Sequence, residues 1–285
     1  MIWAFGRLLL IAAISSLCII FVVFGLRLVG AKQTYSDFTH PLLDHGRWLI
    51  ANGGDLDFGP EQSMTALRHA VEVNPHIFLG LKIRLTLDGH WVLYAPSRLE
   101  QLTSGNGFVL QKNLDEITSL KFKDSPDQSP LEISTVFKEF PNANYYIDVL
   151  QPGATQLKSL YRLIKEHHLE KKVILTSGFV DTLTNLRDED AVWLTGASTA
   201  EYSKSQFMNS IFLETVMGLN FDVFVTDKNT PRLISELKRR KKIVVFKVDD
   251  RPELMSALAT DSQIGILTKR PSYFTQKVDS HALSH

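Results

Sequence analysis

Cysteine is almost absent from this chain, which has one among its 285 residues. That residue, Cys18, lies inside a long apolar stretch near the N-terminus. The remainder of the chain therefore has no disulfide, no thiolate nucleophile and no cysteine-ligated metal site. Enzyme classes that depend on thiol chemistry are excluded on this ground.

An excess of charge of either sign is also absent. The 31 lysines and arginines balance the 31 aspartates and glutamates, so the formal net charge is zero. Without a basic field, nucleic acid is not an expected partner. The chain also lacks an internal repeat and a low-complexity linker. A hydrophobic content of 44% is ample for a sizeable core, and the length suits one α/β barrel or one to two ordinary domains.

Charged residues are missing from Leu8 to Leu26, a mostly apolar run between Arg7 and Arg27. At about 1.5 Å rise per residue, roughly 20 residues cross the hydrocarbon core of a bilayer. We therefore predict one membrane-spanning helix over residues 8–26, with the lipid bilayer as its partner. Secretory apolar regions run to about 15 residues. An uncleaved signal-anchor is thus favoured over cleavage after Val29-Gly30-Ala31, and it places the C-terminal part outside the cytoplasm, on the periplasmic side.

Four parts follow from this organisation: an anchor over residues 1–31, a juxtamembrane linker over 32–46, a folded domain over 47–275 and a polar tail over 276–285. Strand-like and helix-like segments alternate through the folded domain. Strands are expected at 48–52, 77–85, 91–94, 145–150, 173–176, 191–194, 222–226, 243–248 and 264–268, and helices at 60–73, 113–120, 133–140, 156–168, 207–216, 233–240 and 253–259. About eight such units predict a (β/α)₈ TIM barrel, with an open doubly wound sheet as the alternative.

Short segments of this domain follow one another in the order and spacing of a known family. They are Asn52-Gly53-Gly54, Pro60-Glu61-Gln62-Ser63, Gly80-Leu81-Lys82-Ile83, Thr86-Leu87-Asp88-Gly89, Val92 to Pro96, Leu99 to Gly107, Asn113 to Ile117 and Ile264 to Pro271. Over roughly Trp48 to Tyr273 the chain resembles the glycerophosphodiester phosphodiesterases. The resemblance implies a barrel of the PLC-like phosphodiesterase type, phosphoric diester hydrolysis of glycerophospho compounds, and Ca²⁺ or Mg²⁺ as cofactor.

The family's catalytic residues do not recur at the matching positions. In the family two histidines act as general acid and base, an arginine grips the phosphate, and carboxylates hold the divalent cation. The corresponding positions here are Asn52, Gly53, Gly80, Lys82 and Ala95. Asp148, at the place of a later metal-binding glutamate, is the only acid left. The resemblance therefore implies a barrel that has lost its catalytic residues and its metal, so no cofactor is expected.

Elementary chemistry agrees with that loss. A hard cation takes about six to eight oxygen ligands, and one aspartate beside the ammonium of Lys82 cannot supply them. A general acid or base contributes about 10²–10⁴-fold, and neither Asn52 nor Ala95 has a proton that titrates near neutral pH. We therefore expect a catalytically degenerate relative that binds a phosphorylated, lipid-derived ligand or a protein. The alternatives are an active phosphoric diester hydrolase with a rebuilt, non-standard site and a structural protein with an empty barrel.

Candidates for such a rebuilt site are few. Asp55 and Asp57, in the loop after the first strand, are the best of them, although loop capping is the ordinary interpretation of these aspartates. His90 lies in a hairpin turn, at the wrong end of its strand. The histidines interpreted as surface or core residues are His45, His69 and His76.

Two lysines at strand ends predict a different kind of site. Lys82 and Lys269 stand where the family has aspartates, so the local formal charge changes by about four units, from a cation site toward an anion site. We expect both lysines to face the barrel mouth with Asn52 between them, and the predicted ligand residues are Asn52, Lys82, Asp148 and Lys269. The alternative is that Lys269 points outward and pairs with a surface carboxylate.

One basic run, Lys238-Arg239-Arg240-Lys241-Lys242, separates a predicted helix from a predicted strand. Cations at the C-terminus of a helix complement its dipole, and this is the ordinary interpretation. Contact with anionic lipid headgroups is the alternative, worth about 1 kcal/mol per charge near the surface.

Overall fold

The computed structural model describes residues 2–33, 39–44, 48–152, 157–189, 193–248 and 264–273. Its centre is a barrel of eight parallel strands, β1 (Leu49–Asn52), β2 (Phe78–Leu85), β5 (Asn144–Val149), β6 (Val173–Thr176), β7 (Leu194–Thr195), β8 (Val223–Thr226), β9 (Ile243–Lys247) and β10 (Ile264–Thr268). The strand order is β7-β6-β5-β2-β1-β10-β9-β8. A parallel bridge from Gly196 to Val223 brings the two ends of this order together. The predicted TIM barrel is confirmed, and the open sheet is excluded.

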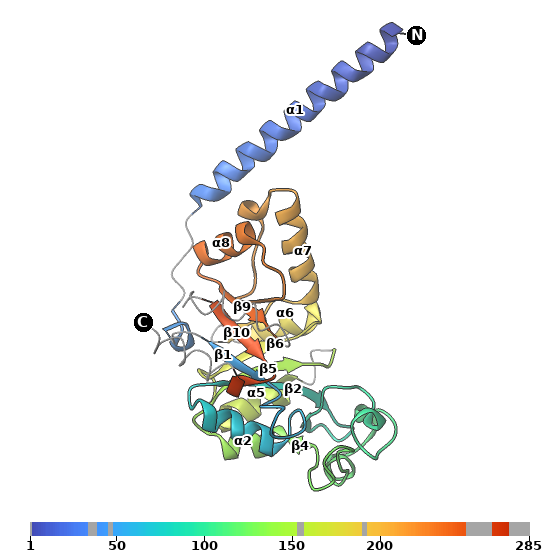
Figure 1. Cartoon of the computed structure of the whole chain (residues 1–285), viewed down its shortest axis with the longest axis vertical. Coiled ribbons are helices and arrows are strands. Elements are labelled where there is room, and N and C mark those ends of the chain that lie inside the picture. The colour runs from blue at the N-terminus through green and yellow to red at the C-terminus, as the bar shows by residue number, and fades with distance from the viewer. Residues whose placement is uncertain are drawn as a thin grey trace.

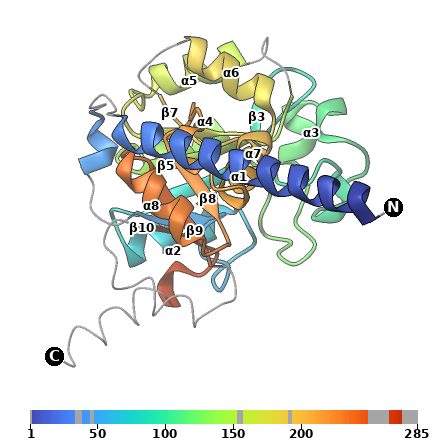
Figure 2. The same ribbon diagram turned by 90° about the horizontal axis from the view of Figure 1, so that it is seen from above.

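Helices follow the strands and cover the outside of the barrel (Figures 1 and 2). In chain order they are α2 (Met64–Val73), α4 (Ile133–Glu139), α5 (Leu157–Glu166), α6 (Val180–Glu189), α7 (Thr199–Ser210) and α8 (Pro231–Arg239). The helix predicted at 253–259 lies outside the described residues, as do the predicted polar tail and His45.

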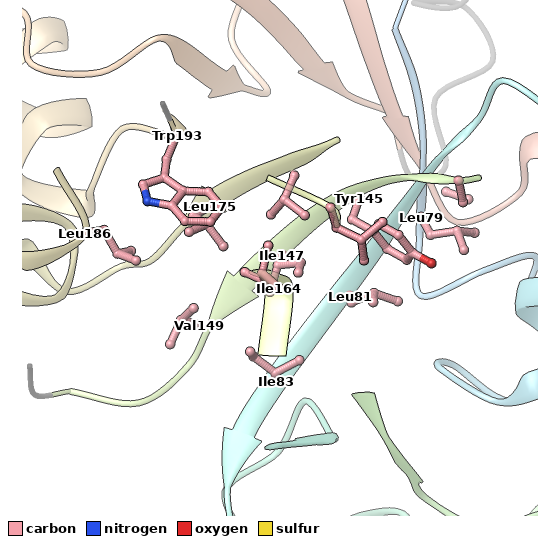
Figure 3. Close-up of a cluster of buried hydrophobic side chains, with 14 of the residues drawn as sticks. Leu79, Leu81, Ile83, Tyr145, Ile147, Val149, Ile164, Leu175, Leu186 and Trp193 are labelled. Atoms are coloured by element: carbon pink, nitrogen blue, oxygen red, sulfur yellow. The ribbon is translucent and has the colours of Figure 1, made fainter. Parts of the chain in front are cut away.

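Side-chain alternation divides the core into two layers. Outward positions of β2 and β5 pack against the helices, and Figure 3 shows them meeting Ile164 of α5. Inward positions of the strands form a second cluster, which includes Ile50, Phe78, Tyr146 and Val245. Because successive side chains of a strand point to opposite faces, Gly80 and Lys82 continue the inward row of Phe78 toward the carboxyl end of β2.

An antiparallel extension and a small lobe interrupt the barrel after β2. Strand β3 (Trp91–Leu93) pairs with β2, and β4 (Leu131–Glu132) pairs with β3. The lobe between them contains η2 (Leu99–Gln101), η3 (Val109–Gln111) and α3 (Leu114–Thr118). Its own apolar cluster comprises Val92, Tyr94, Leu99, Val109, Ile117 and Phe122. The segments from Leu99 to Gly107 and from Asn113 to Ile117 belong to this lobe.

Two predicted helices need correction, and one helix was not predicted. The helix predicted from Pro60 begins at Met64, because Gln62 has a φ of 68° and Ser63 caps the helix by accepting a hydrogen bond from the Ala66 amide. The helix predicted over 207–216 ends at Ser210. It is followed by Phe212, with a φ of 64°, and by the short η4 (Glu214–Val216). Helix α6 was not predicted.

Most other boundaries agree with prediction to within one or two residues. The strand predicted at 191–194 overlaps β7 (Leu194–Thr195) only at Leu194, and residues 191 and 192 lie outside the described range. Helix α5 begins at Leu157, beside residues outside the described range. In the described chain, one helix is long and apolar enough to cross a membrane. It lies within α1 (Ile2–Lys32), over Leu9–Lys32, with a mean hydropathy of 2.8. It projects from the barrel (Figure 1), and the short η1 (Pro41–Asp44) precedes β1.

Candidate ligand site at the barrel mouth

A pocket of about 240 Å³ opens at the carboxyl ends of the barrel strands. Active sites of (β/α)₈ barrels lie at this end. The polar part of the described lining comes from Asn52, Lys82, Tyr146, Asp148, Lys247 and Lys269. The structure thus brings together the four residues predicted from the sequence and adds Tyr146 and Lys247. Lys247 is the last residue of β9. It stands two residues after the inward-facing Val245, so the alternation of side chains along the strand could have identified it from the sequence.

The parallel pairing of the strands places these side chains. Lys82 lies opposite Asp148 in the pairing of β2 with β5, and Asn52 lies opposite Gly80 in the pairing of β1 with β2. A Cβ on Gly80 would lie 2.9 Å from the Ala51 carbonyl oxygen and 3.1 Å from the Asn52 Cα. Since both neighbours are backbone atoms, this backbone has no room for a larger side chain at position 80 unless β1 shifts.

Glycine is required for a different reason in the turn after β1. Gly53 and Gly54 have φ values of 83° and 94°, in the region that favours glycine. A Cβ on Gly53 would lie 2.4 Å from the Cγ of Glu61. Side chains larger than glycine at this position are therefore opposed by both the backbone conformation and Glu61.

Glu61 is the main site residue that sequence reasoning missed. Its carboxylate contacts the Lys82 ammonium through Oε1, and its Oε2 lies 3.6 Å from the Lys269 Nζ. The neighbouring Gln62 holds β2, because the Lys82 amide donates to its Oε1 at 2.6 Å. Lys82 and Lys269 therefore share one internal counterion. Lys269 does pair with a carboxylate, but that carboxylate belongs to the mouth.

Arg84 supports the rim of the mouth. It donates to the Leu150 carbonyl at 2.8 Å through Nη1 and to the Ala95 carbonyl at 2.8 Å through Nη2. Ala95 contributes no atom to the described lining of the pocket. Its carbonyl instead joins the lobe to Arg84 of β2, and the same guanidinium reaches the Leu150 carbonyl after β5.

Asp148 contributes the one carboxyl group in the described lining of this pocket, and the pKa of that group is shifted. Burial raises its pKa from 3.8 to about 6, although Lys82 and Arg84 act in the opposite direction. Burial also raises the pKa of Tyr146 beside it. Below about pH 6, Asp148 is therefore largely neutral, and the pocket becomes more positive as the pH falls.

The raised pKa of Asp148 predicts a pH-dependent effect on stability. The folded protein holds this proton more tightly than the unfolded chain, so folding stability is lost as the pH rises from about 4 to about 6. Asp148→Asn removes this pH-dependent loss of folding free energy, because asparagine does not titrate. One pKa unit corresponds to about 1.36 kcal/mol, so the stability of the variant relative to wild type should increase by about 2 kcal/mol between pH 4 and pH 8. Denaturant unfolding at both pH values measures this change, and a constant difference would contradict the assignment.

The residues considered for a rebuilt acid site lie apart from this pocket. Asp55 is fully buried, and its carboxylate accepts from the Asp57 amide at 3.3 Å and contacts the His69 Nδ1 at 2.9 Å. Phe58 stacks on His69 with 3.3 Å between ring centroids. Asp57 pairs with Arg270 at 3.1 Å. These contacts are those of loop capping.

His76 and His90 contribute no atom to the described lining of the mouth. The His90 Nδ1 lies 2.8 Å from Glu132 of β4, and His76 is exposed. Among the residues that the structure describes, no three or more His, Cys, Asp or Glu side chains gather in a way that could hold a metal ion.

This chain is similar to known proteins both in sequence and in fold. No protein-family model matches the chain. A glycerophosphodiester phosphodiesterase of Caldanaerobacter subterraneus subsp. tengcongensis is 30% identical over 142 residues, which make up 45% of this chain and 57% of that protein. The chain thus spans little more than half the length of this curated relative.

Two solved structures share the fold. A glycerophosphodiester phosphodiesterase from Agrobacterium tumefaciens superposes with a TM-score of 0.67 at 14% identity, over 80% of this chain and 99% of that one. An Oleispira antarctica phosphodiesterase, in complex with the product sn-glycerol-3-phosphate, gives a TM-score of 0.68 at 13% identity, over 82% of this chain and 97% of that one. In sequence over about half of its length, and in fold over the barrel, the chain is therefore similar to glycerophosphodiester phosphodiesterases.

Proposed function

We propose that this chain is a membrane-anchored, non-catalytic relative of the glycerophosphodiester phosphodiesterases whose barrel mouth binds a small phosphate-bearing ligand. The observation that carries the proposal is the group of three lysines at the mouth, Lys82, Lys247 and Lys269, which line the pocket with Asn52. Two carboxylates lie among them, Asp148 in the described lining and Glu61 in contact with Lys82 and Lys269. An arrangement with more cations than anions attracts a phosphate and repels a divalent metal.

The absence of catalysis is supported by the lack of space for larger side chains at Gly80 and Gly53, two positions where the family has catalytic or metal-binding residues. An acid at position 80 would collide with the backbone of β1, and a larger side chain at position 53 would collide with Glu61. The mouth has therefore been rebuilt around these glycines, and single substitutions are not expected to restore a metal site. The described lining contains no histidine and no carboxyl group besides Asp148, so it offers no second residue of the kinds that most often complete an acid–base pair.

The ligand is expected to be a headgroup fragment. Pockets for drug-sized molecules measure about 300–1,000 Å³, whereas this one measures about 240 Å³. A deacylated glycerol phosphate suits that volume better than a lipid with two acyl chains. The Oleispira antarctica structure contains sn-glycerol-3-phosphate on the same fold, which supports its choice as a probe.

Titration of the full-length protein with sn-glycerol 3-phosphate tests the proposal. At low ionic strength we expect weak binding that decreases as salt is added, because salt screens partly exposed charges. Lys82→Ala should weaken this binding by about 1 kcal/mol, or roughly fivefold, the contribution of one partly exposed ion pair. Lys112→Ala, which removes an exposed lysine paired with Glu116 in the lobe, is the matched control. Equal affinity of wild type and Lys82→Ala would contradict the anion site.

A rebuilt phosphoric diester hydrolase is the second candidate, and the raised pKa of Asp148 is the observation that favours it. A carboxyl group with a pKa near the working pH is suited to general acid or base catalysis. Release of glycerol 3-phosphate from glycerophosphocholine or glycerophosphoethanolamine, measured with added Ca²⁺ or Mg²⁺ against a heat-killed control, separates the two. Activity that is lost in Asp148→Asn would establish the hydrolase, whereas the binding proposal expects no release.

Anchoring by α1 rests on its length and composition, and its contacts with the barrel suit a helix that is retained. Carbonate-washed membranes should keep the full-length protein. A soluble product beginning near Lys32 would show instead that α1 is a cleaved leader. The accessibility of a C-terminal tag to an added protease tests the expectation that the barrel lies outside the cytoplasm.

A further inference from the structure

The end of the barrel opposite the mouth carries the junction between α1 and the folded domain. Segment η4 precedes β8 and helix α8 precedes β9, so η4 and the end of α8 lie at the amino ends of barrel strands. The last turns of α1 contact η4 closely, since a Cβ on Gly30 would lie 2.4 Å from the Thr215 carbonyl oxygen. The Arg27 Nη1 lies 3.1 Å from the carboxylate of Glu214, whose side chain is 2% exposed.

Arg239, the last residue of α8, completes this junction. Its guanidinium donates to the carbonyls of Gly30 at 3.1 Å and Gln33 at 3.0 Å. The last carbonyls of a helix have no partner within the helix, and a cation there also complements the helix dipole. The direction in which α1 leaves the barrel is therefore fixed by packing, an ion pair and a helix cap.

Beside this junction the molecule exposes apolar side chains. Phe207, Ile211 and Phe212 are 61%, 38% and 50% exposed. Two guanidiniums lie over the Phe212 ring, that of Arg232 at 4.0 Å and that of Arg27 at 5.9 Å from its centroid. Aromatic rings bordered by cations are typical of protein surfaces at the level of lipid headgroups.

We propose that this face, formed by Phe207, Ile211, Phe212, Arg27 and Arg232, rests on the lipid bilayer from which α1 emerges. A bilayer is the occupant because the apolar part of α1 begins at the same junction. Figure 1 shows α7 and α8 on the side of the barrel from which α1 leaves, and Figure 2 shows α1 passing over them. The three apolar side chains lie at the headgroup level, and the two arginines contact lipid phosphates.

This arrangement determines which ligands reach the mouth. The bilayer-facing surface and the mouth lie at opposite ends of the barrel strands, so the mouth opens toward water. Its ligand then arrives as a dissolved, deacylated fragment. The inference rests on the proposed anchoring and on the proposed site at the mouth.

Spin labels on the full chain in nanodiscs of phosphatidylcholine and phosphatidylglycerol test the surface. Native Cys18, exposed on α1, reports insertion of the helix. In a Cys18→Ser background, Phe207→Cys and Ile211→Cys report on the surface. Phe179→Cys is the matched control, because Phe179 is 43% exposed and follows β6 at the mouth end. The measurement is the ratio of collision rates with oxygen and with a water-soluble nickel complex.

We expect this ratio to be severalfold higher for labels at 207 and 211 than for the label at 179. Equal ratios at the three positions, with a label at Cys18 in lipid, would overturn the bilayer-facing surface and leave the anchor intact. A label at Cys18 accessible to the nickel complex would overturn the anchor and the surface together. Neither result changes what the titration with glycerol phosphate shows about the mouth.

Discussion

Glu61→Gln should raise the affinity of the barrel mouth for glycerol phosphate by roughly thirtyfold. The Glu61 carboxylate contacts both Lys82 and Lys269, so it occupies the cations that a phosphate would use. An incoming anion must replace both contacts. At about 1 kcal/mol for each partly exposed ion pair, removal of the competing charge is worth about 2 kcal/mol, or roughly thirtyfold in Kd. Glutamine keeps the length and shape of the side chain beside Gly53.

Calorimetric titration of the full-length protein measures this effect. Glu139→Gln is the matched control, because it neutralises an exposed carboxylate that pairs with Arg68 at 2.7 Å and lies away from the pocket. The control should bind glycerol phosphate as wild type does. Unchanged affinity in Glu61→Gln would show that Lys82 and Lys269 do not contact the ligand. It would leave Lys247 as the remaining lysine of the described lining.

A pH series adds a second check on the same site. Asp148 loses its negative charge as the pH falls through about 6. The phosphate of the ligand also gains a proton near pH 6, so the measured quantity is the affinity relative to Asp148→Asn, which is neutral at position 148 throughout. From pH 8 to pH 5 the affinity of wild type should increase relative to that of Asp148→Asn, and the affinity of Glu61→Gln should increase relative to that of the double variant.

The barrel was predictable from the sequence because strand alternation is a local property. Alternation along β2 predicts which of its residues share a face, and the family resemblance implies that the face of Lys82 is the inward one. Helix α6 escaped prediction because Leu183 and Leu186 are fully buried but give too few apolar positions for a clear helical stripe. The real start of α2 depends on the positive φ of Gln62, which no residue pattern indicates for a residue other than glycine.

The counterion of the two lysines could not be predicted for a related reason. Glu61 follows a proline and was assigned to the first turn of a helix. Its carboxylate reaches Lys82 and Lys269 because the chain turns at Gly53, Gly54 and Gln62. The contact is tertiary and joins segments that are far apart in the sequence. The position of Lys269 at the end of the last strand, in contrast, follows from the closure of the barrel.

The basic run shows the same limit. From the sequence, residues Lys238 to Lys242 form one group of cations at the end of a helix. In the structure Arg239 caps α1, whereas Arg240 is 5% exposed and bonded inside the barrel base. Arg239 and Arg240 therefore have different roles because one is partly exposed and the other is buried. Their burial depends on the packing of η4 against α8, which the sequence does not show.

Arg240→Ala should destabilise the folded protein by about 3–5 kcal/mol, the usual result of breaking a buried ion pair by removing one partner. The Arg240 guanidinium donates to the carboxylate of Glu236 at 2.6 Å. It also donates to the carbonyls of Met217 at 2.5 Å, Thr215 at 2.5 Å and Glu214 at 3.1 Å. Truncation leaves these carbonyls without a buried donor, and each unmet buried hydrogen bond is costly.

Thermal unfolding in detergent, followed by circular dichroism, measures the loss. For a protein of this size about 1 kcal/mol corresponds to about 2–4 °C in Tm, so we expect a decrease of about 10 °C. Arg240→Lys should recover little of it, because one ammonium cannot reproduce the planar fork that reaches four acceptors. Arg239→Ala is the matched control. The Arg239 side chain is 34% exposed, so its removal should cost about 1 kcal/mol at most.

The pH dependence of the stability difference between wild type and Arg240→Ala distinguishes loss of the ion pair with Glu236 from a destabilisation that does not involve this pair. Burial opposes ionisation of Glu236, but hydrogen bonds from Arg239 and Arg240 hold its pKa below the ordinary value. A depressed carboxyl pKa contributes stability above the unfolded value of about 4.3, and that stability is lost as the pH falls through the folded value. The difference between wild type and Arg240→Ala should therefore narrow below pH 4. A difference that stays constant down to pH 3 would show that the ion pair with Glu236 does not contribute. A Tm of Arg240→Ala equal to that of wild type at neutral pH would show that Arg240 does not hold η4 in place.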